Sequence, residues 1–78
     1  MRIDKFLKVT KLIKRRTVAN EAADGGRISV NGKTVKPSYN IKVGDIVEVK
    51  FGDKVAKIQV LAIPEKPGMP IEQVIKIL

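Results

Sequence analysis

The sequence contains no cysteine and no histidine among its 78 residues. Disulfides are therefore excluded, and so are histidine acid–base catalysis and the usual cysteine and histidine ligands of zinc. The eight Asp and Glu residues show no paired-carboxylate spacing, and no glycine-rich phosphate loop with its lysine occurs. We therefore expect a protein that is not an enzyme and that has no cofactor and no metal.

Long hydrophobic runs are also missing. The longest apolar run, residues 60–64, is far too short to span a bilayer. The first five residues lack the apolar core of a signal peptide. A chain without cysteine also suits the reducing cytosol. These features predict a small cytoplasmic protein with no membrane partner.

Positive charge is the feature present in excess. Sixteen Lys and Arg residues oppose eight Asp and Glu residues, which gives a net charge of +8 and a pI near 10.1. Such an excess on a small domain favours a polyanionic partner, namely RNA, DNA or an anionic membrane. A basic surface that serves only solubility is the alternative.

The cations concentrate near the amino end, where Asp4 is the one acid in the first sixteen residues. A helix stabilised only by its own side chains would mix charge signs at i, i+4 spacing, so this segment indicates a ligand. Arginine forks suit phosphates or exposed bases, and lysines act as mobile point charges. The cations in this segment are Arg2, Lys5, Lys8, Lys11, Lys14, Arg15 and Arg16.

Aromatic residues are scarce, with two Phe, one Tyr and no Trp. Phe6 and Phe51 are expected in the core, and Tyr39 is the aromatic side chain expected at the surface. Base-by-base reading of single strands is therefore disfavoured. Recognition of RNA shape and phosphate geometry fits the composition better.

Hydrophobic periodicity predicts helices followed by strands. Helices are expected at 3–9 and 17–24, with a turn at 10–14, a cap at Thr17, packing through Val18, Ala19 and Ala22, and a stop at Gly25-Gly26. Strands are expected at 27–30, 33–35, 46–51 and 55–63, with an Asn31-Gly32 hairpin turn and another turn at 52–53. A proline-rich connector at 64–70 precedes a short helix at 71–78, for which a last strand is the alternative.

Five segments then resemble the alpha-L RNA-binding motif in their order and spacing. They are Arg2-Ile3-Asp4-Lys5-Phe6-Leu7, Arg15-Arg16-Thr17-Val18-Ala19, the run from Gly26 to Lys33, Pro37-Ser38-Tyr39 and Val43-Gly44-Asp45. The resemblance implies an α+β fold in which two N-terminal helices pack on a small antiparallel sheet and bind structured RNA. It places the core motif at 1–50 within a domain at 1–63, followed by the connector and C-terminal segment at 64–78.

A free-standing copy of this length with Lys14-Arg15-Arg16-Thr17 resembles the RqcP-type family of ribosome-associated quality control factors. That resemblance implies a monomer that binds large-subunit ribosomal RNA and peptidyl-tRNA and acts with a partner that adds alanine to stalled chains. The heat-shock rescue proteins of the large subunit typically carry a longer basic C-terminal extension, so the printed sequence favours the RqcP type. A generic nucleic-acid chaperone and a module that docks an acidic protein are further alternatives.

The charge pattern and the turn residues assign roles to individual residues, and the resemblance singles out Arg2 and Arg16. The expected RNA contacts are Arg2, Lys5, Lys8, Lys11, Lys14, Arg15, Arg16, Arg27 and Lys33, with Arg2 and Arg16 foremost. The residues expected to support the motif are Asp4, Gly26, Asn31, Gly32, Gly44 and Asp45. Asp4 is expected to hold the arginines or orient the helix start, and Asp45 to bond local backbone. Asn20 and Gly25 replace a basic and a polar residue of the motif, so no contact is carried over to them.

Overall fold

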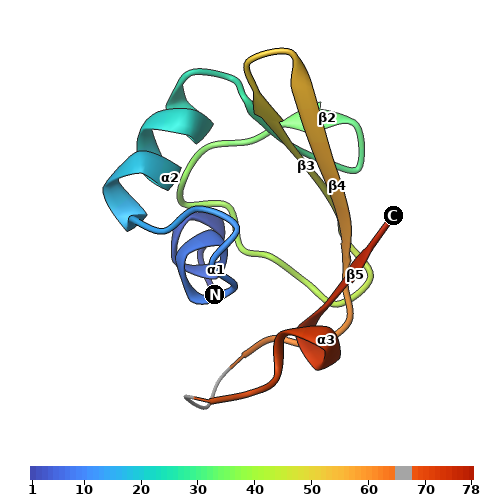
Figure 1. Cartoon of the computed structure of the whole chain (residues 1–78). Coiled ribbons are helices and arrows are strands. Elements are labelled where there is room, and N and C mark those ends of the chain that lie inside the picture. Colours follow the sequence, from blue (N-terminus) through green and yellow to red (C-terminus); the bar gives the residue numbers. More distant parts are fainter. Residues whose placement is uncertain (65–67) are drawn as a thin grey trace.

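Two N-terminal helices face an antiparallel sheet, which is the α+β class that the sequence predicts (Figure 1). The computed structural model describes residues 1–64 and 68–78. The helices are α1 (Ile3–Val9), α2 (Arg16–Asp24) and α3 (Ile71–Val74). The strands are β1 (Ile28–Val30), β2 (Lys33–Thr34), β3 (Ile46–Phe51), β4 (Lys54–Val60) and β5 (Ile75–Ile77).

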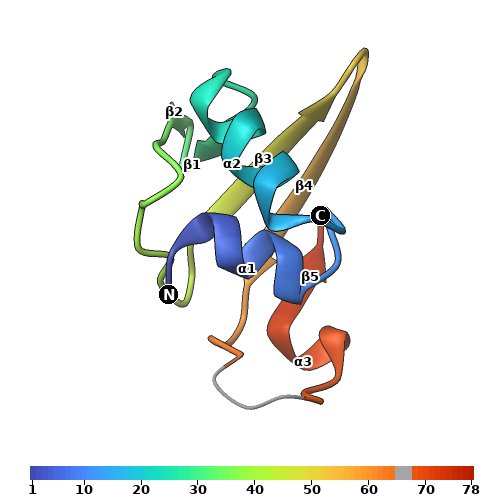
Figure 2. The same cartoon turned by 90° about the vertical axis from the view of Figure 1, so that its left-hand side faces the viewer.

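The five strands lie in the order β2-β1-β3-β4-β5, and every neighbouring pair is antiparallel. Asn31 and Gly32 both have positive φ, 52° and 86°, which gives the two-residue turn expected between β1 and β2. The longer β3–β4 hairpin projects beyond the helices (Figure 2). The sheet therefore has one face partly covered by α1 and α2, while the other carries neither helix.

The core lies between the two helices and the sheet. Ile3, Phe6 and Leu7 of α1 are fully buried, and each such side chain stabilises the fold by about 1.5–3 kcal/mol. The sheet meets them with alternate residues of its strands, including Val47, Val49, Ile58 and Val60. On α2 the buried residues are the small side chains Ala19, Ala22 and Ala23, which allow the two helices to approach closely.

The end of α2 shows why two glycines stand there. Gly26 has φ 76°, the N–H of Gly26 donates to Ala23 O, and the N–H of Arg27 donates to Ala22 O at 2.9 Å. This pair of hydrogen bonds is the Schellman arrangement, in which the left-handed residue is favoured to be glycine. It ends α2 and turns the chain into β1, as the sequence predicts.

Four local expectations are wrong. Thr17 does not cap α2, because Arg16 already begins the helix, with Arg15 at the cap position and no capping side chain. Val18 does not pack in the core but is 47% exposed. Phe51 is 45% exposed, because it lies at the end of β3 where the hairpin has passed the helices. Tyr39 is partly buried rather than exposed, since its ring packs against the core.

The C-terminal segment also differs from the expected helix at 71–78. Only Ile71–Val74 is helical, and Ile75–Ile77 forms β5, which pairs with β4 through Val60↔Ile75 and Ile58↔Ile77. Strand β4 itself ends at Val60 rather than at residue 63. Part of the expected connector, residues 65–67, lies outside the described residues. The expected boundary between a domain at 1–63 and a C-terminal segment at 64–78 stays a prediction. The side chains of Val74 and Ile75 are buried in the same hydrophobic core as those of the N-terminal helices and the sheet.

Candidate nucleic-acid interface

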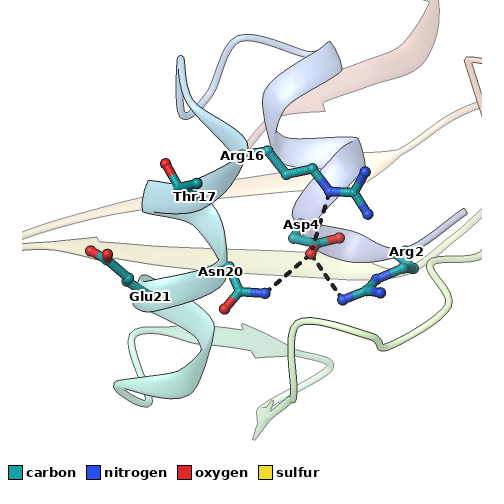
Figure 3. A pocket seen from close by; sticks show the side chains of 6 residues that line it. All are labelled: Arg2, Asp4, Arg16, Thr17, Asn20 and Glu21. Atoms are coloured by element: carbon teal, nitrogen blue, oxygen red, sulfur yellow. Dashed lines mark hydrogen bonds and ion pairs between the residues drawn. The ribbon is translucent and has the colours of Figure 1, made fainter.

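A buried carboxylate organises the arginines near the amino end. Asp4 lies in the first turn of α1, and only 1% of it is exposed. Its Oδ2 lies 3.1 Å from Arg2 Nη2 and 3.6 Å from Arg16 Nε. Two residues on different sides of the α1–α2 turn therefore converge on one carboxylate (Figure 3).

Asp4 accepts two further contacts that complete its surroundings. The Lys5 backbone N–H donates to Oδ1 at 2.8 Å, and the Asn20 side-chain amide donates to Oδ2 at 3.4 Å. Burial raises the pKa of Asp4, but the Asn20 and Lys5 hydrogen bonds and the charges of Arg16 and Arg2 outweigh it. The pKa therefore lies below its usual value, and the carboxylate is ionised at neutral pH.

One carboxylate neutralises only one of the two guanidinium charges. The side chains of Arg2 and Arg16 remain 46% and 47% exposed, and each contacts Asp4 through one nitrogen. A guanidinium has five N–H donors, so most of them still face outwards. The pair therefore presents oriented forks with a net positive charge.

The arginine pair lines an open hollow of about 420 Å³, together with Asp4, Thr17, Asn20 and Glu21. Asn20 points towards Asp4, whereas Thr17 and Glu21 extend along the outer side of α2 (Figure 3). Asn20 is a site residue that the sequence reasoning missed. It lies four residues after Arg16 and therefore on the same side of α2, and that spacing was the available signal.

Three lysines form a second hollow beside the end of α1. Lys11 has φ 61°, which reverses the chain after α1, while the Thr10 hydroxyl donates to Phe6 O at 2.8 Å. This turn brings Lys8, Lys11 and Lys14 around Val9 to line a hollow of about 430 Å³. Five of the seven N-terminal cations thus line one of two separate hollows.

The remaining predicted contacts line neither hollow. Lys5 is exposed on α1, Arg15 precedes α2, Arg27 follows α2, and Lys33 lies on the edge strand β2. All four are exposed to solvent. Arg2 and Arg16 therefore differ from the other expected contacts, because both contact the same buried carboxylate, Asp4.

A second buried carboxylate fixes the loop that holds the amino end. Asp45 accepts hydrogen bonds from the Asn31 amide, the Tyr39 hydroxyl and the Lys42 backbone N–H at 3.1, 3.2 and 2.9 Å. Burial, followed by the charge and the hydrogen bond of Asp45, raises the pKa of Tyr39. Asp45 thus bonds local backbone, and it also ties the loop to the β1–β2 turn.

This loop in turn positions Arg2. The Ile3 N–H donates to Tyr39 O at 2.7 Å, and the Ile41 N–H donates to Met1 O at 2.9 Å. The backbone of Arg2 forms an isolated antiparallel β-bridge with that of Asn40. Asp45 therefore supports Arg2 indirectly, because it holds the loop to which the backbone around Arg2 is hydrogen-bonded. Gly44 lies in the turn just before Asp45.

Among the residues that the structure describes, no group of three His, Cys, Asp or Glu side chains is placed to hold a metal ion. None of the helices in residues 1–64 and 68–78 is long and apolar enough to cross a membrane.

Comparison with known families agrees with this geometry. The S4 domain matches residues 1–47, which contain α1, α2, the loop and both buried carboxylates. The chain belongs to the S4-domain family. This match confirms the alpha-L resemblance, whose core was expected at 1–50.

Two kinds of named relatives resemble this chain. The RQC P-site tRNA stabilizing factor of Bacillus subtilis is 58% identical over 60 residues, covering 77% of this chain and 70% of the relative. The Heat shock protein 15 homolog of Aeromonas salmonicida is 28% identical over 76 residues, covering 96% of this chain and 58% of the relative. The resemblance to RqcP-type factors is thus confirmed.

Two solved structures share the S4 fold. The trimeric structure of Vibrio cholerae Heat Shock Protein 15 aligns with a TM-score of 0.89 at 24% identity, over 100% of this chain and 81% of that chain. The solution structure of the hypothetical protein HP1423 aligns with a TM-score of 0.83 at 31% identity, over 100% and 96%. The described residues of this chain therefore follow a known architecture.

Proposed function

We propose that this S4 domain is a non-catalytic RNA-binding factor of ribosome-associated quality control. It binds ribosomal RNA of the large subunit and peptidyl-tRNA, and it stabilises the tRNA while stalled chains are extended with alanine. The observation that carries the proposal is the Arg2–Asp4–Arg16 arrangement, in which two half-exposed forks rest on one buried anion. The name of the Bacillus subtilis relative supports the choice of tRNA as a ligand.

The physical advantage of this arrangement is preorganisation. A free arginine side chain loses considerable rotamer freedom when it binds a phosphate, which weakens binding. Arg2 and Arg16 have lost part of that freedom already, because Arg2 donates a hydrogen bond to Asp4 and Arg16 forms an ion pair with it. Their outward N–H groups can then form bidentate contacts with phosphates or a base edge.

The proposal implies a cytoplasmic monomer that meets a second protein on the large subunit, the partner that adds alanine. The remaining cations at Lys5, Lys8, Lys11, Lys14, Arg15, Arg27 and Lys33 supply further phosphate contacts. Their contribution is electrostatic, so binding should fall steeply with salt, with a slope of about 0.7–0.9 for each neutralised phosphate.

The test is co-sedimentation of the chain with purified large subunits that hold peptidyl-tRNA. Arg16→Ala should weaken binding by about 1.5–3 kcal/mol, or on the order of 10- to 100-fold, because a charged hydrogen-bonding group is lost. Arg16→Lys should fall between Arg16→Ala and the wild type, since it keeps the charge and loses the fork. Lys36→Ala is the matched control, because it removes one exposed cation outside both N-terminal hollows.

Unchanged co-sedimentation of Arg16→Ala would contradict the proposed interface. Equal affinity for duplex DNA and large-subunit RNA would favour a generic nucleic-acid chaperone instead.

A second candidate is a large-subunit rescue factor of the heat-shock type. The similarity to the Aeromonas salmonicida protein over 96% of this chain favours it. The two candidates differ in whether alanine tailing of stalled chains depends on this protein. Loss of alanine tails from stalled chains after deletion of the gene supports the quality-control factor, and intact tails support the rescue factor.

A further inference from the structure

The face of the sheet opposite α1 and α2 carries a line of three lysines. Because side chains alternate along a strand, the residues between the buried Val47, Val49 and Ile58 lie on this other face. Its charged residues on β3, β4 and β5 are Lys50, Glu48, Lys57 and Lys76, and the three lysines are exposed.

The strand register sets the order of these lysines. Lys50 lies opposite Val55, Glu48 opposite Lys57, and Gln59 opposite Lys76. Lys57 is therefore the diagonal neighbour of both Lys50 and Lys76. Diagonal neighbours are about 7–8 Å apart, so the three lysine positions lie on one diagonal line across three strands.

The charge of this path is only partly compensated. Glu48 Oε1 lies 3.8 Å from Lys57 Nζ, and the two side chains are 31% and 50% exposed. A long ion pair between exposed groups is weak. The other residues that the register places on this face of the three strands have uncharged side chains: Ile46, Val55 and Gln59.

We propose that this sheet face is a second RNA-binding surface, so that the domain binds two RNA segments, one on each side of the sheet. The inference rests on the proposed function, which requires contact with both ribosomal RNA and tRNA. Lysines on flexible stems act as point charges that can follow a phosphodiester backbone. This face carries no aromatic residue on which a base could stack, so it should bind the backbone without reading sequence.

RNA fits this face better than a protein partner. Lysine is depleted in protein–protein interfaces, whose energetic centres are aromatic residues and arginine. The described strands offer three lysines here and neither of those residue types. The Arg2–Asp4–Arg16 arrangement lies on the helix side, so it leaves the lysine face open to a second RNA segment (Figure 1).

The test is a two-step capture with the full chain. An immobilised duplex RNA hairpin is saturated with protein, and fluorescent bulk tRNA is then added. The wild type should retain tRNA on the hairpin. The combined variant Lys50→Gln, Lys57→Gln and Lys76→Gln should still bind the hairpin but should lose on the order of tenfold or more in tRNA affinity, with the salt slope lower by about 2–3.

The matched control is the combined variant Lys36→Gln, Lys42→Gln and Lys54→Gln. It has the same change in net charge, but two of its positions lie in the β2–β3 loop, and Lys54 lies opposite Phe51 on the other face of the sheet. It should capture tRNA nearly as well as the wild type. Glu48→Gln should raise tRNA capture, because it removes the carboxylate beside Lys57.

The outcomes separate this inference from the proposed function. Hairpin binding without tRNA capture by the wild type would overturn the second surface and leave the helix-side interface intact. Equal losses in the two combined variants would also overturn it, since net charge alone would then explain the effect. If the sheet-face variant still captured tRNA but no longer bound poly-glutamate, the ligand of the lysine face would be an acidic protein and not RNA. A wild type that bound neither RNA would contradict both proposals.

Discussion

At the scale of single residues, Asp4 limits how Arg2 and Arg16 can move. The carboxylate is buried, is held by Asn20 and the Lys5 N–H, and contacts both guanidinium groups. The negative charge of Asp4 slightly lowers the long-range attraction between this site and RNA. Asp4 also orients the guanidinium groups of Arg2 and Arg16. The proposed function requires the gain in RNA affinity from this orientation to exceed the loss from the added negative charge.

Asp4→Asn separates these two effects. The substitution raises the net charge from +8 by one unit, so simple electrostatics predicts tighter RNA binding. Loss of the anchor predicts weaker binding, and we expect a decrease on the order of tenfold in affinity for large subunits. Filter binding of subunits at fixed salt measures it, and tighter binding would contradict the orienting role.

The effect of Asp4→Asn on the free energy of unfolding should depend on pH. Since the folded-state pKa of Asp4 is lowered, its ionised form contributes stability above the unfolded pKa of about 3.9, and this is lost as pH falls through the folded pKa. Asp4→Asn should cost about 1–3 kcal/mol at neutral pH and much less in acid. Urea unfolding of both proteins at neutral pH and at about pH 2 tests this, because the difference is lost only as pH falls through the lowered folded-state pKa of Asp4. A difference that stays constant over this range would contradict it.

Part of this site could be predicted from sequence. Asp4 stands alone among cations, so a role in holding arginines was the natural expectation. The contact from Asn20 needs the packing of α1 against α2, and the contact from Tyr39 to Asp45 needs the path of a long loop. Neither is a local property, so the sequence alone suggested an exposed Tyr39 and no contact for Asn20.

At the scale of elements, the last eight residues show competition between two periodicities. Ile71, Val74, Ile75 and Leu78 have helical spacing, yet Ile75-Lys76-Ile77 also alternates as a strand does. The open edge of β4 decides between them, because pairing with Val60 and Ile58 buries Ile75 and satisfies the backbone. By contrast, α1 and β3 have one dominant periodicity each, and their bounds match the prediction.

Ile75→Ala should therefore destabilise the whole domain. Ile75 is 6% exposed and lies opposite Val60 in the core, so truncation should cost about 2–3 kcal/mol. Ile77→Ala is the matched control, because Ile77 is 79% exposed and should cost less than about 0.5 kcal/mol. Urea unfolding measures both, and equal effects would show that β5 adds little to the common core.

At the scale of the whole molecule, positive charges lie on both sides of a small α+β domain. The helix side carries arginines oriented by Asp4, and the sheet side carries a line of lysines from three strands. The net charge and the clustered N-terminal cations could be read from sequence. The lysine line could not, because its members are far apart in the chain and meet only through strand register.

The central claim is that the helix side, through Arg2 and Arg16, binds RNA of large subunits that hold tRNA. Crosslinking in living cells, followed by sequencing of the attached RNA, tests it most directly. The account predicts that large-subunit ribosomal RNA and tRNA dominate the crosslinks, and that Arg16→Ala reduces both while Lys36→Ala does not. Enrichment of messenger or small-subunit RNA, or an Arg16→Ala pattern equal to that of the wild type, would contradict it.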